Sequence, residues 1–172
     1  MNLLNYLPTV PDFPKPGIMF KDISPLLADQ KAFSFAIEQL YGLSHFCEFD
    51  YILGIESRGF IFATALSQVS QKGLVLARKP NKLPKKVYSQ SYGLEYGTDA
   101  LEIQQDLLPS MAKVLLIDDV LATGGTLAAA ASLVKKAGAQ VAGTLVLLEI
   151  LELMGSQKLG IENIQSKSLI QI

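Results

Sequence analysis

The stretch Val114-Leu-Leu-Ile-Asp-Asp-Val-Leu-Ala-Thr-Gly-Gly-Thr126 runs from apolar residues through two adjacent carboxylates into a Gly/Thr turn, and an alanine-rich segment follows. A short apolar run bounded by turn residues is typical of a buried strand, so we expect a strand over 114–117 and a helix beginning near Thr126. The first N–H groups of a helix lack internal partners and carry the positive end of its dipole. Because Gly124 and Gly125 have no Cβ, the backbone can wrap closely around an anion. The stretch therefore predicts a phosphate cradle.

The carboxylates Asp118 and Asp119 stand next to this cradle in the sequence. They cannot bind phosphate, but they suit hydroxyls, Mg²⁺ or a developing cation. Phosphate, diol and metal together indicate a sugar phosphate. Two other phosphate motifs are excluded, because the stretch lacks the Lys of a Walker loop and does not have Gly-x-Gly-x-x-Gly spacing. The alternative interpretation is a structural strand, turn and capped helix with surface aspartates.

Short apolar strands alternate with helical segments along the chain. We expect helices over 31–46, 60–69 and 127–137, and strands over 51–55, 74–77, 114–117 and 141–148. This alternation predicts an α/β fold in which helices flank a parallel sheet. Ligands of such sheets bind beyond the carboxyl ends of the strands, which is where Glu56, Arg78 and Asp118 fall. No repeat or linker divides the 172 residues, so we expect a single domain over 1–172.

The composition excludes several classes of protein. With 15 basic and 16 acidic residues, the net charge of −1 gives no electrostatic reason to bind nucleic acid. The single cysteine, Cys47, excludes a disulfide framework and fits a reducing compartment. No apolar run reaches the roughly 18 residues of a membrane helix, and no export signal is recognisable. We therefore expect a cytoplasmic protein that does not enter a membrane.

A second anion-binding motif, Gly54-Ile-Glu-Ser-Arg-Gly-Phe60, follows the expected strand over 51–55. A strand, a Ser-Arg-Gly turn and a helix create an oxyanion pocket, in which Arg58 could hold a diphosphate with two hydrogen bonds. Taken alone the motif is weak, because an exposed Arg after a strand is ordinary. Combined with the cradle at 122–126, it predicts two anion sites at one edge of the sheet.

The pattern of strands and helices breaks over 79–101, which is rich in Pro, Gly and Lys. A connection this long inside a compact domain is usually functional or disordered. We expect a long flexible loop that closes over an anionic substrate; the alternative is a solvated basic loop.

Four blocks of the chain, in order, resemble the adenine phosphoribosyltransferases, a branch of the type I phosphoribosyltransferases. They are Phe-Pro-Lys-Pro-Gly-Ile-Met-Phe-Lys-Asp-Ile-Ser-Pro from Phe13, the Gly54–Phe60 motif, Arg-Lys-Pro-Asn-Lys-Leu-Pro from Arg78 with Leu-Glu-Tyr-Gly from Leu94, and the stretch over 114–126. The last block identifies only the superfamily, whereas the first block and Leu-Glu-Tyr-Gly are specific to the adenine branch. Lys21 departs from this pattern, since many relatives have Arg there, and the segment after Leu159 is divergent.

The resemblance implies a type I phosphoribosyltransferase fold with a small N-terminal hood, a catalytic loop and a role for each motif. Asp118 and Asp119 would hold the ribose hydroxyls of 5-phosphoribosyl 1-pyrophosphate (PRPP). Its 5-phosphate would lie on Ala122, Thr123, Gly124, Gly125 and Thr126. The pyrophosphate group would be bound by a loop that often contains a non-proline cis peptide, and by cations acting partly across a dimer interface: Glu56, Ser57, Arg58, Arg78, Lys79 and Lys82. Adenine would be read by Met19, Phe20 and Lys21, and Glu95 would handle the purine proton.

The reaction implied is the conversion of adenine and PRPP to AMP and pyrophosphate by a homodimer. Mg²⁺ is the implied cofactor, held mainly by PRPP and water near Asp118 and Asp119, with no ligand coming directly from the protein. Two alternatives stay open. One is a phosphoribosyltransferase for another nucleobase, which the block from Phe13 disfavours. The other is a non-catalytic regulator that senses PRPP and binds nucleic acid, which the balanced charge disfavours.

Overall fold

The computed structural model describes residues 1–93 and 99–172. The chain divides into two compact units, Met1–Gln39 and Leu40–Ile172, and each is described by itself. The expectation of a single domain over 1–172 stays a prediction, since this division does not say whether the units fold independently.

The N-terminal unit holds a short hairpin, one helix and most of a second helix, which continues into the second unit. After the 3-10 helix η1 (Leu3–Tyr6), strands β1 (Thr9–Pro11) and β2 (Met19–Lys21) pair antiparallel, and helices α1 (Ser24–Ala28) and α2 (Gln30–Ser44) follow. Asp29 caps α2, as its Oδ1 accepts a hydrogen bond from the amide of Ala32 at 2.9 Å. Pro25 lies in the first turn of α1, where a missing N–H is harmless.

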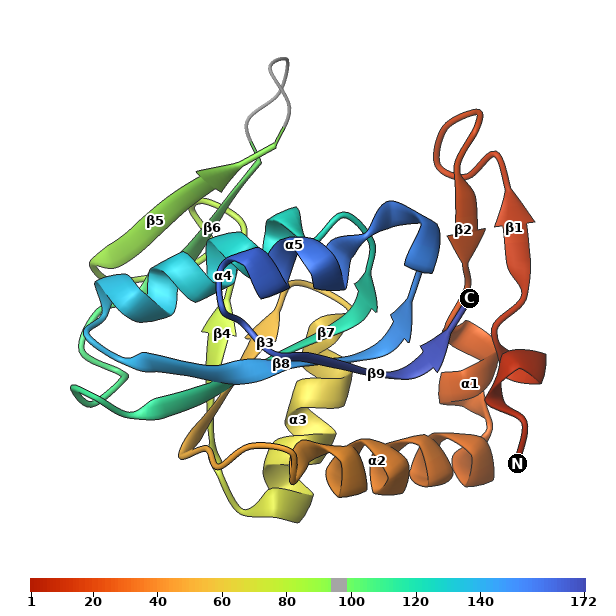
Figure 1. Cartoon of the computed structure of the whole chain (residues 1–172), viewed down its shortest axis with the longest axis horizontal. Coiled ribbons are helices and arrows are strands. Elements are labelled where there is room, and N and C mark those ends of the chain that lie inside the picture. The colour runs from red at the N-terminus through yellow and green to blue at the C-terminus, as the bar shows by residue number, and fades with distance from the viewer. Residues whose placement is uncertain (94–98) are drawn as a thin grey trace. The chain divides into compact units, whose positions relative to one another are not determined.

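The second unit is built on a five-stranded sheet in the order β4-β3-β7-β8-β9, and every neighbouring pair is parallel. This confirms the predicted α/β fold with a parallel sheet (Figure 1). The strands are β3 (Tyr51–Ile55), β4 (Gly73–Ala77), β7 (Lys113–Leu121), β8 (Gln140–Glu149) and β9 (Ser166–Gln171). The predicted strand over 114–117 is too short. Pairing of β7 with β8 continues to Leu121, so both aspartates lie within the strand.

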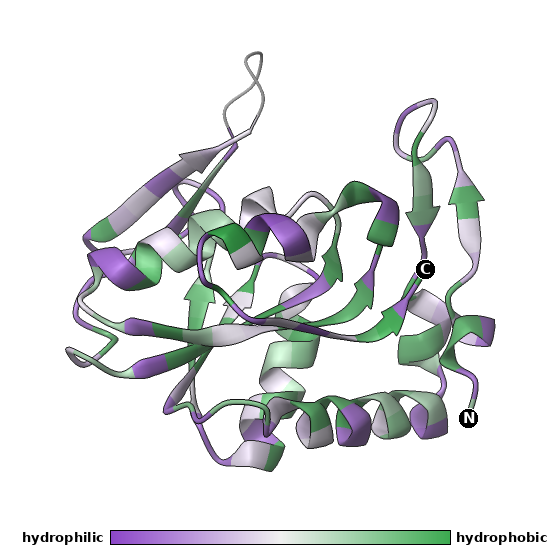
Figure 2. Ribbon diagram, viewed as in Figure 1, coloured by the Kyte–Doolittle hydropathy of each residue, from purple (hydrophilic) through white to green (hydrophobic). Residues whose placement is uncertain are grey.

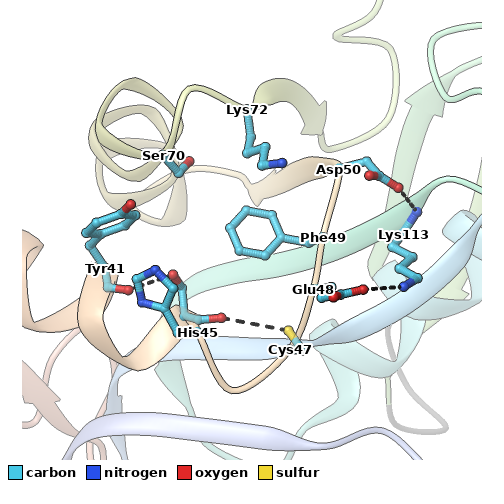
Figure 3. Close-up of a pocket in the computed structure, with 10 residues that line it drawn as sticks. Tyr41, His45, Cys47, Glu48, Phe49, Asp50, Ser70, Lys72 and Lys113 are labelled. Carbon is cyan, nitrogen blue, oxygen red and sulfur yellow. Dashed lines mark hydrogen bonds and ion pairs between the residues drawn. The ribbon is translucent and has the colours of Figure 1, made fainter.

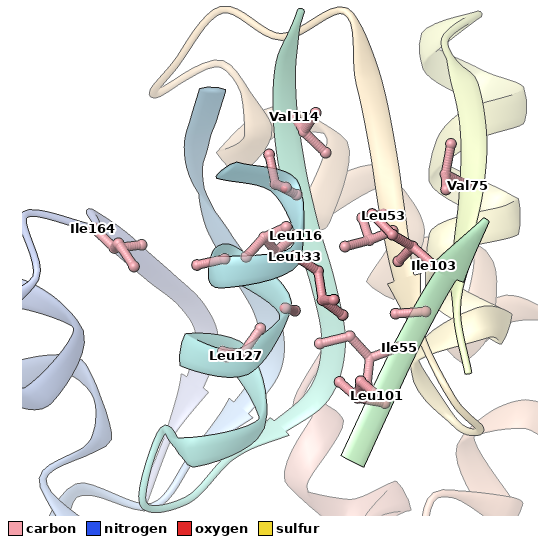
Figure 4. Packing of buried hydrophobic residues seen from close by; sticks show 14 of the residues in the cluster. Leu53, Ile55, Val75, Leu101, Ile103, Val114, Leu116, Leu127, Leu133 and Ile164 are labelled. Carbon is pink, nitrogen blue, oxygen red and sulfur yellow. The ribbon is translucent and has the colours of Figure 1, made fainter. Parts of the chain in front are cut away.

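Helices cover both faces of this sheet. Helix α3 (Gly59–Ser70) packs on β3 and β7, and α4 (Gly125–Lys136) packs on the opposite face (Figure 1). Beneath α4, alternate residues of β3 and β7 form the main apolar core with residues of α4, such as Leu53, Ile55, Val114, Leu116, Leu127 and Leu133 (Figure 4). A left-handed Gly138 (φ 77°) follows α4, as expected for a helix end. The chain then continues through β8, the 3-10 helix η2 (Leu151–Leu153) and α5 (Gly155–Ile161) to β9.

The stretch expected to be a long loop contains an antiparallel hairpin. Strands β5 (Val87–Tyr92) and β6 (Asp99–Gln104) pair along their whole length and pack against α4. The apolar side of β6, Leu101 and Ile103, is fully buried in the core. The expectation of an unstructured stretch over 79–101 is therefore wrong for the two strands, and the flexibility of the segment stays a prediction.

Hydropathy follows this architecture. Figure 2 shows that β7 and β8 are apolar along much of their length and hydrophilic where they begin, at Lys113 and Gln140. Across residues 1–93 and 99–172, none of the helices combines the length and apolar character needed to span a bilayer.

Candidate active site

Two loops meet at the carboxyl edge of the sheet because the strands that precede them, β3 and β7, are neighbours. The first loop contains a cis peptide bond between Glu56 and Ser57, which confirms the non-proline cis peptide expected there. Nε of Arg58 lies 2.8 Å from Oδ2 of Asp119 and joins this loop to the last residues of β7. Gly59 lies directly against β7. A Cβ at this position would lie 2.8 Å from Oδ1 of Asp118 and 2.9 Å from the carbonyl oxygen of Ile117, so a larger residue would force the loop and the strand apart.

The two aspartates form a buried acidic pair. The side chain of Asp119 is almost fully buried, that of Asp118 is half-buried, and Oδ1 of Asp118 accepts the amide of Asp119 at 2.9 Å. Burial and the charge of Asp119 raise the pKa of Asp118 well above its ordinary value. Burial also raises the pKa of Asp119, although the Arg58 guanidinium opposes that shift. Both carboxylates therefore gain from a ligand that supplies hydrogen-bond donors or positive charge.

One oxygen of this pair lacks a well-formed hydrogen bond. Within the described part of the chain, Oδ2 of Asp119 is buried without a hydrogen bond of good geometry, and its close contact with Arg58 is an ion pair. The charge of Arg58 therefore offsets part of the cost of burying this oxygen.

The turn after β7 has the form of an anion cradle. Gly124 takes a left-handed conformation (φ 79°) at the N-cap of α4, and the cap makes no side-chain hydrogen bond to the helix. The N–H groups of the first turn thus stay available to an anion. They surround a hollow of about 60 Å³, which is lined by Asp118, Val120, Leu121, Ala122, Thr123, Gly124, Gly125, Thr126 and Leu127.

A larger cavity of about 380 Å³ joins the cradle, the acidic pair and the first loop. Its lining comprises Glu56, Ser57, Arg58, Lys79, Tyr92, Asp99, Asp118, Asp119, Val120, Ala122 and Thr126. A single cavity thus holds cations, carboxylates and a helix N-terminus, a combination that suits a ligand with two anionic groups and a diol.

The carboxylate of Glu56 holds Arg78 and Lys79 in place beside the first loop. It accepts hydrogen bonds from Nε and Nη2 of Arg78, both at 3.3 Å, and from the amide of Lys79 at 2.8 Å. Burial would raise the pKa of Glu56, but these donors outweigh it and the pKa is lowered. Arg78 also donates from Nη1 to the carbonyl of Lys82 at 3.2 Å. Arg78 and Lys82 therefore flank the cavity without lining it.

Lys79 ties the cavity to the end of β5 and the start of β6, where Tyr92 pairs with Asp99. Its Nζ lies 2.9 Å from the hydroxyl of Tyr92 and 2.9 Å from Oδ2 of Asp99. Burial would lower the pKa of Lys79, but these two partners raise it. Tyr92 and Asp99 were not predicted as site residues. Their only signal in the sequence is their position on either side of the Leu-Glu-Tyr-Gly block.

The remaining predicted residues lie elsewhere. Met19, Phe20 and Lys21 form β2 of the N-terminal unit, where the ring of Phe20 packs edge-on against Phe13 at 5.0 Å. Nζ of Lys21 donates to Oγ1 of Thr9 at 2.6 Å, so its side chain has a partner on β1. Glu95 lies outside the described residues.

A cavity of about 440 Å³ opens at the other end of the sheet, where the strands begin (Figure 3). It is lined by Tyr41, Ser44, His45, Cys47, Glu48, Phe49, Asp50, Ser70, Lys72 and Lys113. Nζ of Lys113 bonds Oε2 of Glu48 at 2.9 Å, and its amide bonds Asp50. Although larger, this cavity contains none of the predicted site residues and lies at the edge opposite to where ligands of parallel sheets bind.

Comparison with known proteins agrees with this geometry. Residues 26–158 match the model of the phosphoribosyl transferase domain. The chain is 60% identical over 171 residues to an adenine phosphoribosyltransferase of Polynucleobacter asymbioticus, with 99% of each chain covered. It belongs to the adenine phosphoribosyltransferases.

Solved adenine phosphoribosyltransferases share the whole fold. The crystal structure of the enzyme from Thermoanaerobacter pseudethanolicus superposes with a TM-score of 0.94 at 42% identity, covering 99% of this chain and 98% of the other. An enzyme of the same family from Giardia lamblia, complexed with 9-deazaadenine, gives a TM-score of 0.93 at 36% identity, covering 99% and 96%. The family model, the full-length relative and the fold support the adenine branch over both alternatives considered from the sequence.

Proposed function

We propose that the site at the carboxyl edge of the sheet converts adenine and PRPP to AMP and pyrophosphate. The observation that carries this proposal is the ion pair between Arg58 and Asp119, which holds a diphosphate-binding loop against a diol-binding carboxylate. The anion cradle at 122–126 lies in the same cavity as that carboxylate. PRPP carries all three groups that these parts of the cavity suit: a phosphate, a diol and a diphosphate on one ribose.

In this proposal each end of PRPP has its own part of the cavity. The N–H groups at the start of α4 receive the 5-phosphate. The 2- and 3-hydroxyls donate to the carboxylates of Asp118 and Asp119, which line the cavity. The pyrophosphate lies on the loop of Glu56, Ser57 and Arg58, with Lys79 beside it. The Arg78 guanidinium bonds Glu56 and the backbone carbonyl of Lys82, and neither Arg78 nor Lys82 lines the cavity. Both side chains must therefore move to reach pyrophosphate, or reach it from a partner subunit.

The donor set of the cavity fits Mg²⁺ bound mainly by the substrate. Across residues 1–93 and 99–172, no cluster of three or more His, Cys, Asp or Glu side chains forms a complete metal cage. Two adjacent carboxylates do line the cavity, and Mg²⁺ usually takes one or two carboxylates together with substrate phosphates and water. When bound, the ion would neutralise charge on the departing pyrophosphate. Asp118 and Asp119 are the residues that would lie nearest to it.

The protein's own groups then act on a reaction in which one bond breaks and another forms. The bond from C1 of the ribose to the pyrophosphate oxygen breaks with its electron pair on oxygen, and a nitrogen of adenine bonds to C1. Arg58 and Lys79 stabilise the charge on the leaving group, and the carboxylates stabilise the positive ribose. Glu95 is the proposed acceptor of the proton that adenine loses.

Adenine selection is assigned to the N-terminal unit. We expect backbone groups of Met19 and Lys21 to read the amino edge of adenine, with Phe20 beside the ring. The side chain of Lys21 is already bonded to Thr9, which favours a role for the backbone of Lys21 in reading the base. A homodimer, in which Arg78 of one subunit serves the other, completes the proposal.

A panel of bases tests this function directly. The purified chain, PRPP and Mg²⁺ are incubated with adenine, hypoxanthine, guanine, xanthine or orotate, and nucleotide formation is followed. We expect AMP from adenine alone, and no activity in excess EDTA. Comparable turnover of hypoxanthine or orotate would refute the adenine assignment. Retention of DNA in a low-salt gel shift, without turnover of any base, would support a regulator instead.

A further inference from the structure

The first residue of α5, Gly155, packs directly against the backbone of the anion cradle. A Cβ added to Gly124 would lie 3.0 Å from the carbonyl oxygen of Gly155 and 3.4 Å from its Cα. A Cβ added to Gly155 would overlap the carbonyl oxygen of Ala122 and lie 2.6 Å from Cδ1 of Leu121. Two backbones therefore touch with no side chain between them, and one of them is the cradle itself.

The segment behind the cradle is fixed on both sides. The amide of Ile150 donates to the carbonyl of Leu121 at 3.0 Å, which attaches the end of β8 to the end of β7. Four residues into α5, Leu159 is fully buried in the main core, and Ile164 follows it there. Gly155 itself is buried between these two attachments. Neither α5 nor the cradle can retreat easily from an extra atom at their contact.

We propose that Gly155 is a positioning residue for the reaction, because its bare backbone sets where the cradle over 122–126 presents its N–H groups. The inference rests on the proposed function, in which this cradle binds the 5-phosphate of PRPP. An added methyl group must push Ala122 and Leu121 away from Gly155, and both of these residues line the hollow of the anion cradle. A shift of about 1 Å in a positioned group can change a rate by about a hundredfold.

The chain supplies a matched control in the same helix. Gly160 also lies in α5, but a Cβ built there has nothing within 4 Å. Gly155→Ala and Gly160→Ala thus make the same chemical change in one helix, and only the first touches the cradle.

The test measures steady-state kinetics for adenine and PRPP, the dissociation constant of PRPP without adenine, and the melting temperature of each variant. We expect Gly155→Ala to raise the KM and Kd for PRPP by about tenfold to a hundredfold. Its KM for adenine should stay near the value of Gly160→Ala, whereas its Tm should fall because the added atom strains the contact. An unchanged Kd for PRPP in Gly155→Ala would overturn the inference. So would an equal loss in the KM for adenine, because a purely structural glycine would affect both substrates alike.

A second variant covers the case in which Gly155→Ala does not fold. Leu159→Val removes one methylene from the side chain that fixes α5 on the core, a change that cores usually tolerate. We expect a several-fold weaker Kd for PRPP with an unchanged KM for adenine, and an unchanged Kd would refute the inference. If the unaltered chain makes no AMP and binds no PRPP, the proposed function fails instead.

Discussion

Nε of Arg58 lies 2.8 Å from Oδ2 of Asp119, so a cation from the loop after β3 is held against a carboxylate of β7. The pair is largely buried on the aspartate side and about one-third exposed on the arginine side. Asp119 lies between the two predicted anion sites. A substitution there can therefore distinguish an effect on PRPP binding from an effect on folding.

Asp119→Asn should weaken the use of PRPP much more than it weakens the fold. The amide keeps the shape but offers one acceptor oxygen and no charge, so the bond from a ribose hydroxyl loses its charge assistance. That loss is worth about 1.5–3 kcal/mol, or roughly a tenfold to hundredfold fall in kcat/KM for PRPP. Kinetics and thermal melting of the same preparation check this. A loss of activity that follows unfolding would make Asp119 a structural residue.

Asp118→Asn should stabilise the ligand-free chain at neutral pH. Since the pKa of Asp118 is raised in the fold, the folded state binds its proton more strongly than the unfolded chain does. Stability is therefore lost as pH rises from the ordinary pKa of Asp through the raised value, and the amide does not titrate. The Tm of Asp118→Asn should exceed that of the unaltered chain near pH 7, and the difference should shrink toward about pH 4.

Asp106→Asn is the control for that experiment, because Asp106 is exposed and outside the cavity. An equal gain in Tm for both variants would show that overall charge, rather than the buried pair, is responsible.

The Arg78 assignment predicts complementation between two inactive chains. Arg78→Ala and Asp119→Ala are each expected to lose most activity, but a heterodimer would combine an intact Asp119 site with Arg78 from the partner. Activity should return after subunit exchange, measured with differently tagged chains. Proven exchange without recovery would mean that Arg78 serves its own chain, where it already bonds Glu56.

Glu95→Gln should lower kcat by about 10²–10⁴ while leaving the Kd for PRPP and the Tm nearly unchanged, as expected for a group that moves a proton. Glu95 lies outside the described residues, so this prediction rests on the Leu-Glu-Tyr-Gly block alone. Rapid-quench measurement of the chemical step checks it. A rate within a few-fold of the unaltered chain would remove Glu95 from the mechanism, and a large change in PRPP affinity would assign it to binding.

Local sequence patterns predicted the central part of this fold, because strand, turn and helix from Val114 to Ala137 each have a strong local signal. The hairpin β5–β6 was missed, as its first strand alternates between half-buried and exposed polar residues and the surrounding Pro and Gly suggested a loop. Strand β9 was missed for a similar reason: it begins Ser-Lys-Ser and is only half-buried at the edge of the sheet.

Local sequence patterns could not predict which residues of the site contact one another. Glu56 meets Arg78 across 22 residues of sequence, and Lys79 meets Asp99 across 20, so these pairs exist only once the strands are assembled. The residue types were readable from the sequence, but their partners depended on which strands became neighbours.

The two compact units divide the proposed substrate contacts between them. The described residues assigned to PRPP all lie within Leu40–Ile172, whereas Met19, Phe20 and Lys21, assigned to adenine, lie within Met1–Gln39. Under this proposal, recognition of the sugar donor and choice of the base are encoded in separate, consecutive parts of the polypeptide. Substitutions within the first 39 residues would then alter the specificity for the base without changing any residue assigned to PRPP.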